Sequence, residues 1–354
     1  MPSFSLVLAF KGFNASKFIL YLSLLIFVVQ LSLKLDEKLI VNYAIVFLPL
    51  WICHFIVFMG AFTGITSYVR KPPSSNDSVM QNEFVSMILT TIEHMFLLCF
   101  EILVYYKLEH DNVEPKDALI HWSIVFAPVF GLSVFTLIVA VWAMKHEKSF
   151  EFEFFYAVNV IEFFFISFKL DQQVNWSWAV VFIPLWIVLS LCAVGVLYSM
   201  VLTIVISRSR NFAHSYRRQS CYSAVLHIFL VLPALTCLIL LTGKLDSMQW
   251  ADKEAALNMS YCMALCPLWF SLLCLMLLCF GNDGGNVWWF ALRRPFCVFL
   301  LDSCPCLRQL ANTSYKFGAG ENADNEDESE TIGREDPERP LRPIVPLTSI
   351  ECPD

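Results

Sequence analysis

Long apolar stretches alternate with short polar segments along most of the chain. Each stretch is close to the roughly 20 residues that an α-helix needs to cross the hydrocarbon core of a bilayer. The pattern predicts an all-α integral membrane protein with eight transmembrane helices. We expect these helices at residues 16–33, 43–66, 84–106, 121–144, 152–168, 177–205, 220–242 and 259–280. The fifth is the shortest and most polar, but its phenylalanine-rich core favours insertion.

A short signature recurs four times along these predicted helices. Each odd-numbered helix ends in Lys-Leu followed by an acid, and each even-numbered helix carries a proline with an aromatic residue six positions before it. The Lys-Leu-acid segments begin at Lys34, Lys107, Lys169 and Lys244. The prolines are Pro49, Pro128, Pro184 and Pro267, and the aromatic residues are Tyr43, Trp122, Trp178 and Tyr261.

The spacing of the four copies indicates a duplication. The first and third lysines are 135 residues apart, as are the first and third prolines. The second and fourth copies are separated by 137 residues between lysines and 139 between prolines. The sequence therefore predicts two parallel four-helix repeats, residues 1–150 and 151–283, related by an axis along the membrane normal.

Each part of the signature has a physical role. Tyr and Trp are favoured at the membrane–water interface, so the aromatic residue is expected to start the even-numbered helix there. The lysine can extend its charge towards water, while the acid faces water or caps a helix. Proline removes a backbone N–H and bends the helix. Two interpretations of the bends stay open: a packing device used four times, or kinks that frame a cavity between the two halves.

The third predicted helix carries Glu93, His94 and Glu101 in its interior. At about 100° per residue, His94 and Glu101 lie about 20° apart on the helix, and Glu93 lies about 80° from Glu101. A charge at the middle of a bilayer costs about 2.5–3.5 kcal/mol on insertion scales. We therefore expect these side chains to face protein, to carry a proton or to pair with one another.

Three further polar residues could complete a polar centre with them: Asn159 and Glu162 in the fifth helix and His227 in the seventh. Intramembrane carboxylates are candidates for a transport pathway or proton site, and interhelical hydrogen bonding is the competing interpretation. The duplication does not repeat the polar residues, because Val231 and Leu238 stand at the positions matching His94 and Glu101. A symmetric two-site transporter is therefore disfavoured.

Basic residues indicate the orientation. Up to Lys316, fourteen Lys and Arg lie on the side of the two termini, and seven lie on the opposite side. The positive-inside rule therefore predicts that both termini are cytosolic. The net charge of −7 comes from residues 318–354, which hold 11 acidic and 3 basic residues, and the remainder is nearly neutral. This tail is too polar to fold and is expected to be disordered.

Residues 284–317 follow the last predicted helix and form a distinctive segment. Paired tryptophans and paired arginines suggest a cytosolic amphipathic helix lying in the membrane interface (Trp288, Trp289, Arg293 and Arg294). Cys297, Cys304 and Cys306 are candidates for palmitoylation there.

Most of the 13 cysteines fall inside apolar segments, where cysteine behaves as a small hydrophobic residue. No disulfide framework, metal-spacing cluster or nucleophile constellation stands out, so we expect no enzyme activity, no cofactor and no metal. Nothing in the charge distribution suggests nucleic acid binding. The expected partners are the bilayer and either another membrane protein or further copies of the chain.

Several motifs resemble a known family. They are Phe13-Asn14-Ala15-Ser16-Lys17-Phe18, the Lys-Leu-Asp and Val-Phe-x-Pro-Leu-Trp units, and Gly-Gly-Asn-x-Trp-Trp-Phe at 284–290. With these motifs the chain resembles the transmembrane protein 185 family, also called the Fragile-X-F transmembrane family, over nearly its whole length. The resemblance implies a multi-pass protein of endomembranes (endoplasmic reticulum or Golgi) or of the plasma membrane. It supplies no catalytic residues.

Two functions are compatible with these observations. The first is a non-enzymatic scaffold or regulator in a membrane, favoured by the lack of catalytic motifs. The second is a transporter, channel or lipid-moving protein that uses the buried carboxylates of the third helix.

Overall fold

The computed structural model describes residues 13–74, 77–110, 120–146, 151–208, 214–249, 259–280, 286 and 288–291. All of them belong to one unit, Met1–Tyr315, and Lys316–Asp354 form a second unit. The expected disordered tail, 318–354, therefore lies outside the described residues.

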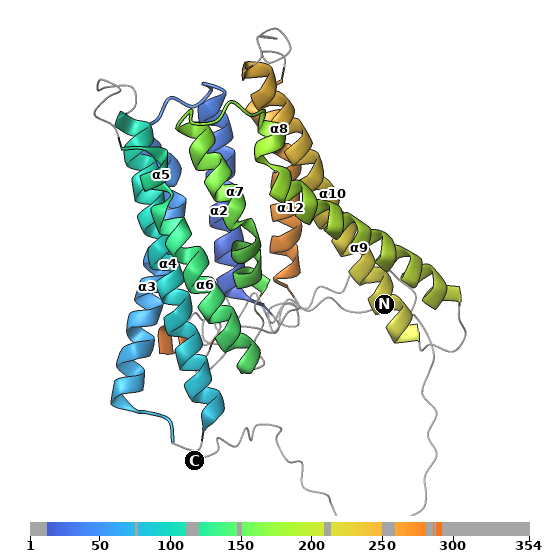
Figure 1. The fold of residues 1–354 in the computed structure, drawn as a ribbon. Coiled ribbons are helices and arrows are strands. Elements are labelled where there is room, and N and C mark those ends of the chain that lie inside the picture. The colour runs from blue at the N-terminus through green and yellow to red at the C-terminus, as the bar shows by residue number, and fades with distance from the viewer. Residues whose placement is uncertain are drawn as a thin grey trace, which may run out of the picture. The chain divides into compact units, whose positions relative to one another are not determined.

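The described part of the chain is built from α-helices (Figure 1). They are α2 (Ala15–Leu35), α3 (Tyr43–Arg70), α4 (Ser78–His110), α5 (Trp122–Val125), α6 (Ala127–Lys145), α7 (Glu151–Leu170), α8 (Trp178–Val181), α9 (Ile183–Arg208), α10 (His214–Gln249) and α12 (Tyr261–Leu278). A short 3-10 turn, η2 (Trp289–Ala291), follows them. Every predicted helix has a counterpart in this set.

Seven helical segments in the described residues are long and apolar enough to cross a membrane, with α5 and α6 taken together as one. The fifth predicted helix forms as α7 but is not among the seven. It carries Glu151, Glu153, Glu162 and Lys169 within 20 residues, and each charge lowers the gain from insertion. These charges therefore explain why α7 is not among the seven apolar segments.

Two of the four signature prolines coincide with helix breaks. Pro128 and Pro184 each lie at the beginning of a helix, directly after the short helices α5 and α8. Pro49 and Pro267 lie inside the continuous helices α3 and α12. Proline lacks the N–H that would continue the hydrogen-bond ladder, and its ring crowds the preceding turn. Proline thus interrupts the helix at two of the four sites and is accommodated within a continuous helix at the other two.

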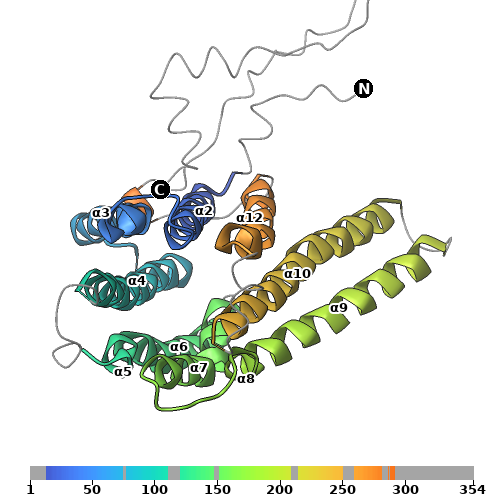
Figure 2. The same ribbon diagram turned by 90° about the horizontal axis from the view of Figure 1, so that it is seen from above.

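The helices form a closed circuit of contacts, termed here the helix ring. Each helix packs on its neighbour in the sequence from α2 to α12, and α12 packs on α2. Figure 2 shows this arrangement along the helices, with α2 between α3 and α12. The first and last helices are therefore direct neighbours, and the ring consists of four helical hairpins: α2–α3, α4–α6, α7–α9 and α10–α12.

The acids of the repeated signature join the hairpins to one another. Each acid accepts hydrogen bonds from backbone N–H groups that begin the second helix of the preceding hairpin, and the first acid reaches the last hairpin. The pairs are Asp36 with Tyr261 and Cys262, Glu109 with Tyr43, Asp171 with Trp122 and Ser123, and Asp246 with Trp178 and Ala179. These contacts satisfy N–H groups that a helix start leaves without partners. They are termed the acid clasps.

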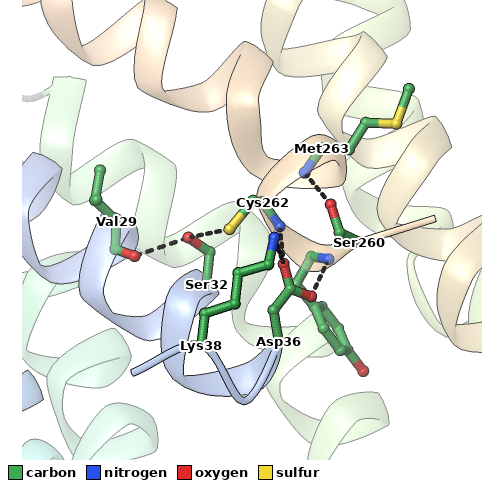
Figure 3. Close-up of polar contacts among 8 residues, drawn as sticks. Val29, Ser32, Asp36, Lys38, Ser260, Cys262 and Met263 are labelled. Atoms are coloured by element: carbon green, nitrogen blue, oxygen red, sulfur yellow. Dashed lines mark hydrogen bonds and ion pairs between the residues drawn. The ribbon is translucent and has the colours of Figure 1, made fainter. Parts of the chain in front are cut away.

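The clasp at Asp36 closes the ring (Figure 3). Its carboxylate oxygens lie 2.6 Å from the Tyr261 nitrogen and 3.1 Å from the Cys262 nitrogen. Burial raises the pKa of Asp36, but the hydrogen bonds from Cys262 and Tyr261 and the charge of Lys38 outweigh it, so the pKa is below its ordinary value. The carboxylate therefore remains charged in the folded protein at neutral pH.

The lysines of the signature contact their own hairpin. Each ammonium group lies over the aromatic ring that begins the second helix of that hairpin, 5.2–5.8 Å from the ring centroid. This distance is typical of a cation–π interaction. The pairs are Lys34 with Tyr43, Lys107 with Trp122, Lys169 with Trp178, and Lys244 with Tyr261. Lysine thus holds each hairpin together, while the acid two positions later links it to the preceding one.

The connections after the acids alternate in geometry. Glu37 and Gln172, which follow the first and third acids, both adopt a left-handed backbone with φ of 57° and 56°. After the second and fourth acids the helix continues, to His110 in α4 and Gln249 in α10. The alternation follows the 135-residue spacing in the sequence.

Candidate functional site

Two helices of the ring enclose a set of hydrogen-bonded polar side chains, termed here the His–Glu network. His54 of α3 lies between His94 and Glu101 of α4. Its Nε2 atom is 3.0 Å from Oε1 of Glu101, and its Nδ1 atom is 3.0 Å from Nδ1 of His94. The network therefore links the two helices by side chains alone.

The helical spacing explains how the network forms. His94 and Glu101 lie on one face of α4 because seven residues complete nearly two turns. His54 lies on the face of α3 that buries Val46, Leu50 and Cys53. The exposed face of α3 carries large apolar side chains instead, among them Phe55, which suits contact with lipid. The packing of α3 on α4 thus brings one histidine opposite the polar face of α4.

The network is mostly buried, with His54 buried and His94 half-buried. The His54 side chain is 6% exposed and that of Glu101 is 13% exposed. The Phe58 ring stacks against His54 with a centroid distance of 6.3 Å. Glu93, one residue before His94, is also buried. These polar groups are therefore enclosed by protein, as the cost of a charge in hydrocarbon demands.

Hydrogen bonding restricts the protonation states of this network. If Glu101 is a carboxylate, Nε2–H of His54 donates to it, and Nδ1 of His54 accepts from Nδ1–H of His94. If Glu101 is protonated, its O–H donates to Nε2 of His54, and Nδ1–H of His54 then donates to Nδ1 of His94. The second oxygen of Glu101 is buried, and among the described residues it has no hydrogen-bond partner. The arrangement can therefore hold one extra proton by reversing its hydrogen bonds.

The other polar residues predicted for this site lie elsewhere. Glu162 is buried in α7, which packs on α6 and α9, and its carboxyl group lies against the backbone N–H of Leu185. His227 of α10 is exposed and bonds to the carbonyl of Ser223 in its own helix. The side chain of Asn159 lies outside the described residues. A single polar centre shared by the third, fifth and seventh helices is thus wrong for Glu162 and His227, because α4 packs on α3 and α6.

An apolar groove of about 590 Å³ lies between α10 and α12. Its lining includes Leu232, Pro233, Met263 and Pro267. None of the polar residues of the His–Glu network contributes to it. Pro267, where a kink was predicted, therefore borders a groove within one hairpin, and the polar groups of α3 and α4 are separate from that groove.

The tryptophans after the last helix differ from the prediction. Trp288 is 6% exposed and packs edge-on against the rings of Tyr68 and Phe84, from α3 and α4. The Trp288 side chain is therefore covered by protein and is not exposed on an amphipathic helix as predicted. The rest of the predicted interfacial segment, with Arg293, Arg294, Cys297, Cys304 and Cys306, lies outside the described residues.

Sequence reasoning missed His54. It is a single histidine in an apolar run, where a buried core histidine is the ordinary interpretation. The available signal was that His54 precedes a Gly60-x-x-x-Gly64 pair on the same helix, since small residues at this spacing allow close packing in membranes.

Among the described residues, no group of three or more His, Cys, Asp and Glu side chains is arranged to hold a metal ion.

The apolar helices, together with the burial of their polar side chains between α3 and α4, define an integral membrane protein of the α-helical class. The family model described as Transmembrane Fragile-X-F protein matches residues 33–271. The chain belongs to this family, which confirms the resemblance found in its motifs. No solved structure matches the chain.

Proposed function

We propose that this protein is a non-enzymatic scaffold or regulator in a membrane. In this proposal α7 crosses the bilayer with the seven apolar segments, which gives eight spans in two four-helix halves and places both termini in the cytosol. Its partner would be another membrane protein or a further copy of the chain. The membrane would be an endomembrane or the plasma membrane.

The observation that carries this proposal is the enclosure of the His–Glu network. His54 and Glu101 are bonded to each other across the α3–α4 interface, and both are buried there. Interhelical hydrogen bonds of this kind stabilise a bundle by about 0.6 kcal/mol on average. The acid clasps add a second set of bonds between hairpins. Both features favour a fixed helical framework over a pathway that must open during each transport cycle.

A proton-coupled transporter is the second candidate. It is favoured by the ability of His94, His54 and Glu101 to reverse their hydrogen bonds when a proton is added. The added proton would lie on Oε1 of Glu101, the oxygen that is 3.0 Å from Nε2 of His54.

Reconstitution of the pure protein in liposomes separates the two functions. A pH-sensitive dye inside the vesicles reports proton entry after an external acid step, with empty liposomes as the reference. We expect no flux above the reference. Flux that is lost in Glu101→Gln would overturn the scaffold and establish transport through this site. Flux that persists in the double variant Glu93→Gln, Glu101→Gln would establish transport by another route.

A scaffold also requires a partner. Cross-linking in intact membranes, followed by size analysis in a mild detergent, is expected to give a species larger than the 40.6 kDa chain. A purely monomeric protein under these conditions would contradict a stable assembly.

A further inference from the structure

Two glycines form a cradle on α3 at the end of the helix away from the acid clasps. A Cβ atom at Gly60 would lie 2.9 Å from the Trp289 ring and 3.1 Å from the Phe290 ring. A Cβ atom at Gly64 would lie 2.5 Å from the backbone oxygen of Trp288. Both positions thus need glycine for the close approach of a segment that follows the last helix.

This segment, Asn286 with Trp288–Phe290, is termed the strap. Figure 1 shows its η2 turn beside α3. The Asn286 amide donates to the carbonyl of Glu83 at 2.5 Å, and Nε1 of Trp288 donates to the carbonyl of Met80 at 2.9 Å. Both acceptors belong to the beginning of α4. The strap therefore bridges α3 and α4 at this end of their interface.

The strap carries a strained residue. Phe290 has φ of 56° and ψ of 15°, a left-handed conformation that is unfavourable for a bulky side chain. Such conformations persist where surrounding contacts impose them, and they are frequent at switch regions. Release of the strap would relieve this strain, so docking is opposed by the backbone of the strap itself.

The strap lies close to the His–Glu network along the same interface. Gly60 is six residues from His54, which corresponds to about 9 Å along α3. Met87 of α4 contacts the Gly64 cradle and is fully buried. It is seven residues from His94, about 10 Å along α4. Met87 thus lies on α4 between the residues that hold the strap and His94.

We propose that the strap is a removable lid on the α3–α4 interface, and that its release lets water reach the His–Glu network. The two polar contacts that hold it use carbonyl groups of α4, so α4 keeps its own backbone ladder when the strap leaves. Tyr68 and Phe84 stack on each other with a centroid distance of 3.9 Å and would remain paired. Release therefore requires no unfolding of either helix.

The test measures the access of water to Glu101 in the full-length protein in detergent. A water-soluble carbodiimide couples an added amine to carboxyl groups that solvent can reach, and mass spectrometry locates the product. The exposed Glu37 serves as the internal standard. We expect little product at Glu101 in the wild type and a several-fold rise in Asn286→Ala, which loses one of the two hydrogen bonds that join the strap to α4.

Gln81→Ala is the matched control for Asn286→Ala. Gln81 also donates its amide to a backbone carbonyl near the start of α4, that of Ser74, and its side chain makes no hydrogen bond with the described residues of the strap. Its removal should leave the labelling of Glu101 unchanged. A rise of equal size in Gln81→Ala would indicate general loosening of α4 and would overturn the proposal.

A second pair of variants tests the cradle. Gly64→Val places a side chain where the strap passes, whereas a Cβ at Gly195 of α9 meets no atom within 4 Å. Gly64→Val should raise the labelling of Glu101, and Gly195→Val should not. If Gly64→Val fails to fold, Asn286→Ala decides alone. Labelling of Glu101 that is as high as Glu37 in the wild type, or unchanged in both strap variants, would overturn the lid.

Discussion

Asp36→Ala removes the clasp that joins the first and last helices. In the wild type the Asp36 carboxylate accepts from two N–H groups at the start of α12, at 2.6 and 3.1 Å. Its side chain is only 8% exposed, so water reaches these groups poorly before the substitution. Alanine leaves both N–H groups without the charged acceptor.

The expected loss of stability is about 2 kcal/mol, because removing an acidic helix cap costs about 0.5–2 kcal/mol and bonds to a charged group are at the upper end. Asp36→Asn retains one carbonyl oxygen as acceptor and should lose about half as much. Glu109 is the natural control, since the hydrogen bond that it accepts from the Tyr43 nitrogen is long, at 3.4 Å. Glu109→Ala should therefore cost about 0.5 kcal/mol or less.

The measurement is unfolding of each purified variant in mixed micelles as the fraction of denaturing detergent rises, followed by far-ultraviolet circular dichroism. A difference of about 1.4 kcal/mol corresponds to a tenfold change in the folding equilibrium. We expect the loss of stability to decrease in the order Asp36→Ala, Asp36→Asn, Glu109→Ala. Equal losses for the two alanine variants, or none for Asp36→Ala, would refute it.

The remaining predictions concern pH and glycine. The pKa of Asp36 and that of Asp171 are both below the ordinary value of 3.8. Their contribution to stability is therefore complete above about pH 5 and is lost as the pH falls through the lowered pKa. The wild type and Asp36→Ala should converge in stability only below about pH 4. A Cβ atom added at Gly243 of α10 would lie in open space, so Gly243→Ala should stabilise the folded protein by about 0.5–1 kcal/mol. Gly131→Ala should gain less in the same unfolding assay, because the Phe96 ring lies 3.1 Å from the new Cβ. A pH-independent difference, or equal gains for the two glycines, would contradict these expectations.

The helices could be located from the sequence because apolar stretches of sufficient length report directly on the environment of a helix. The additional turns at the start of α4 and α10 were missed, since they carry polar residues such as Gln81 and Arg217 and resemble loops in composition. The break before Pro184 was foreseeable as a kink. Whether proline interrupts a helix or is accommodated within it depends on neighbouring helices, which the local sequence does not specify.

The contact partners of the signature residues also depend on distant parts of the chain, so the local sequence does not specify them. A cap was among the roles expected for the acid, and the structure shows that Asp36 caps α12, which begins 225 residues later. The signature repeats four times, but the sequence does not specify which copies contact one another. Only closure of the ring makes the first acid reach the last hairpin.

The candidate site was foreseen in part for a similar reason. His94 and Glu101 share a face by helical periodicity alone. His54 was missed because its role depends on the packing of α3 against α4. The burial of Trp288 was missed because it requires the cradle at Gly60 and Gly64, on a helix more than 200 residues earlier in the chain.

A disulfide between α2 and α12 tests the closed helix ring most directly. Oγ of Ser32 lies 3.7 Å from Sγ of Cys262, and the two residues are 230 positions apart (Figure 3). Ser32→Cys should therefore form a disulfide with the native Cys262 under mild oxidation, detected by mass spectrometry of the linked peptides. Ile26→Cys, at an exposed position of the same helix, should not form it. Failure of Ser32→Cys to link in folded protein, or equal linking by Ile26→Cys, would contradict the ring.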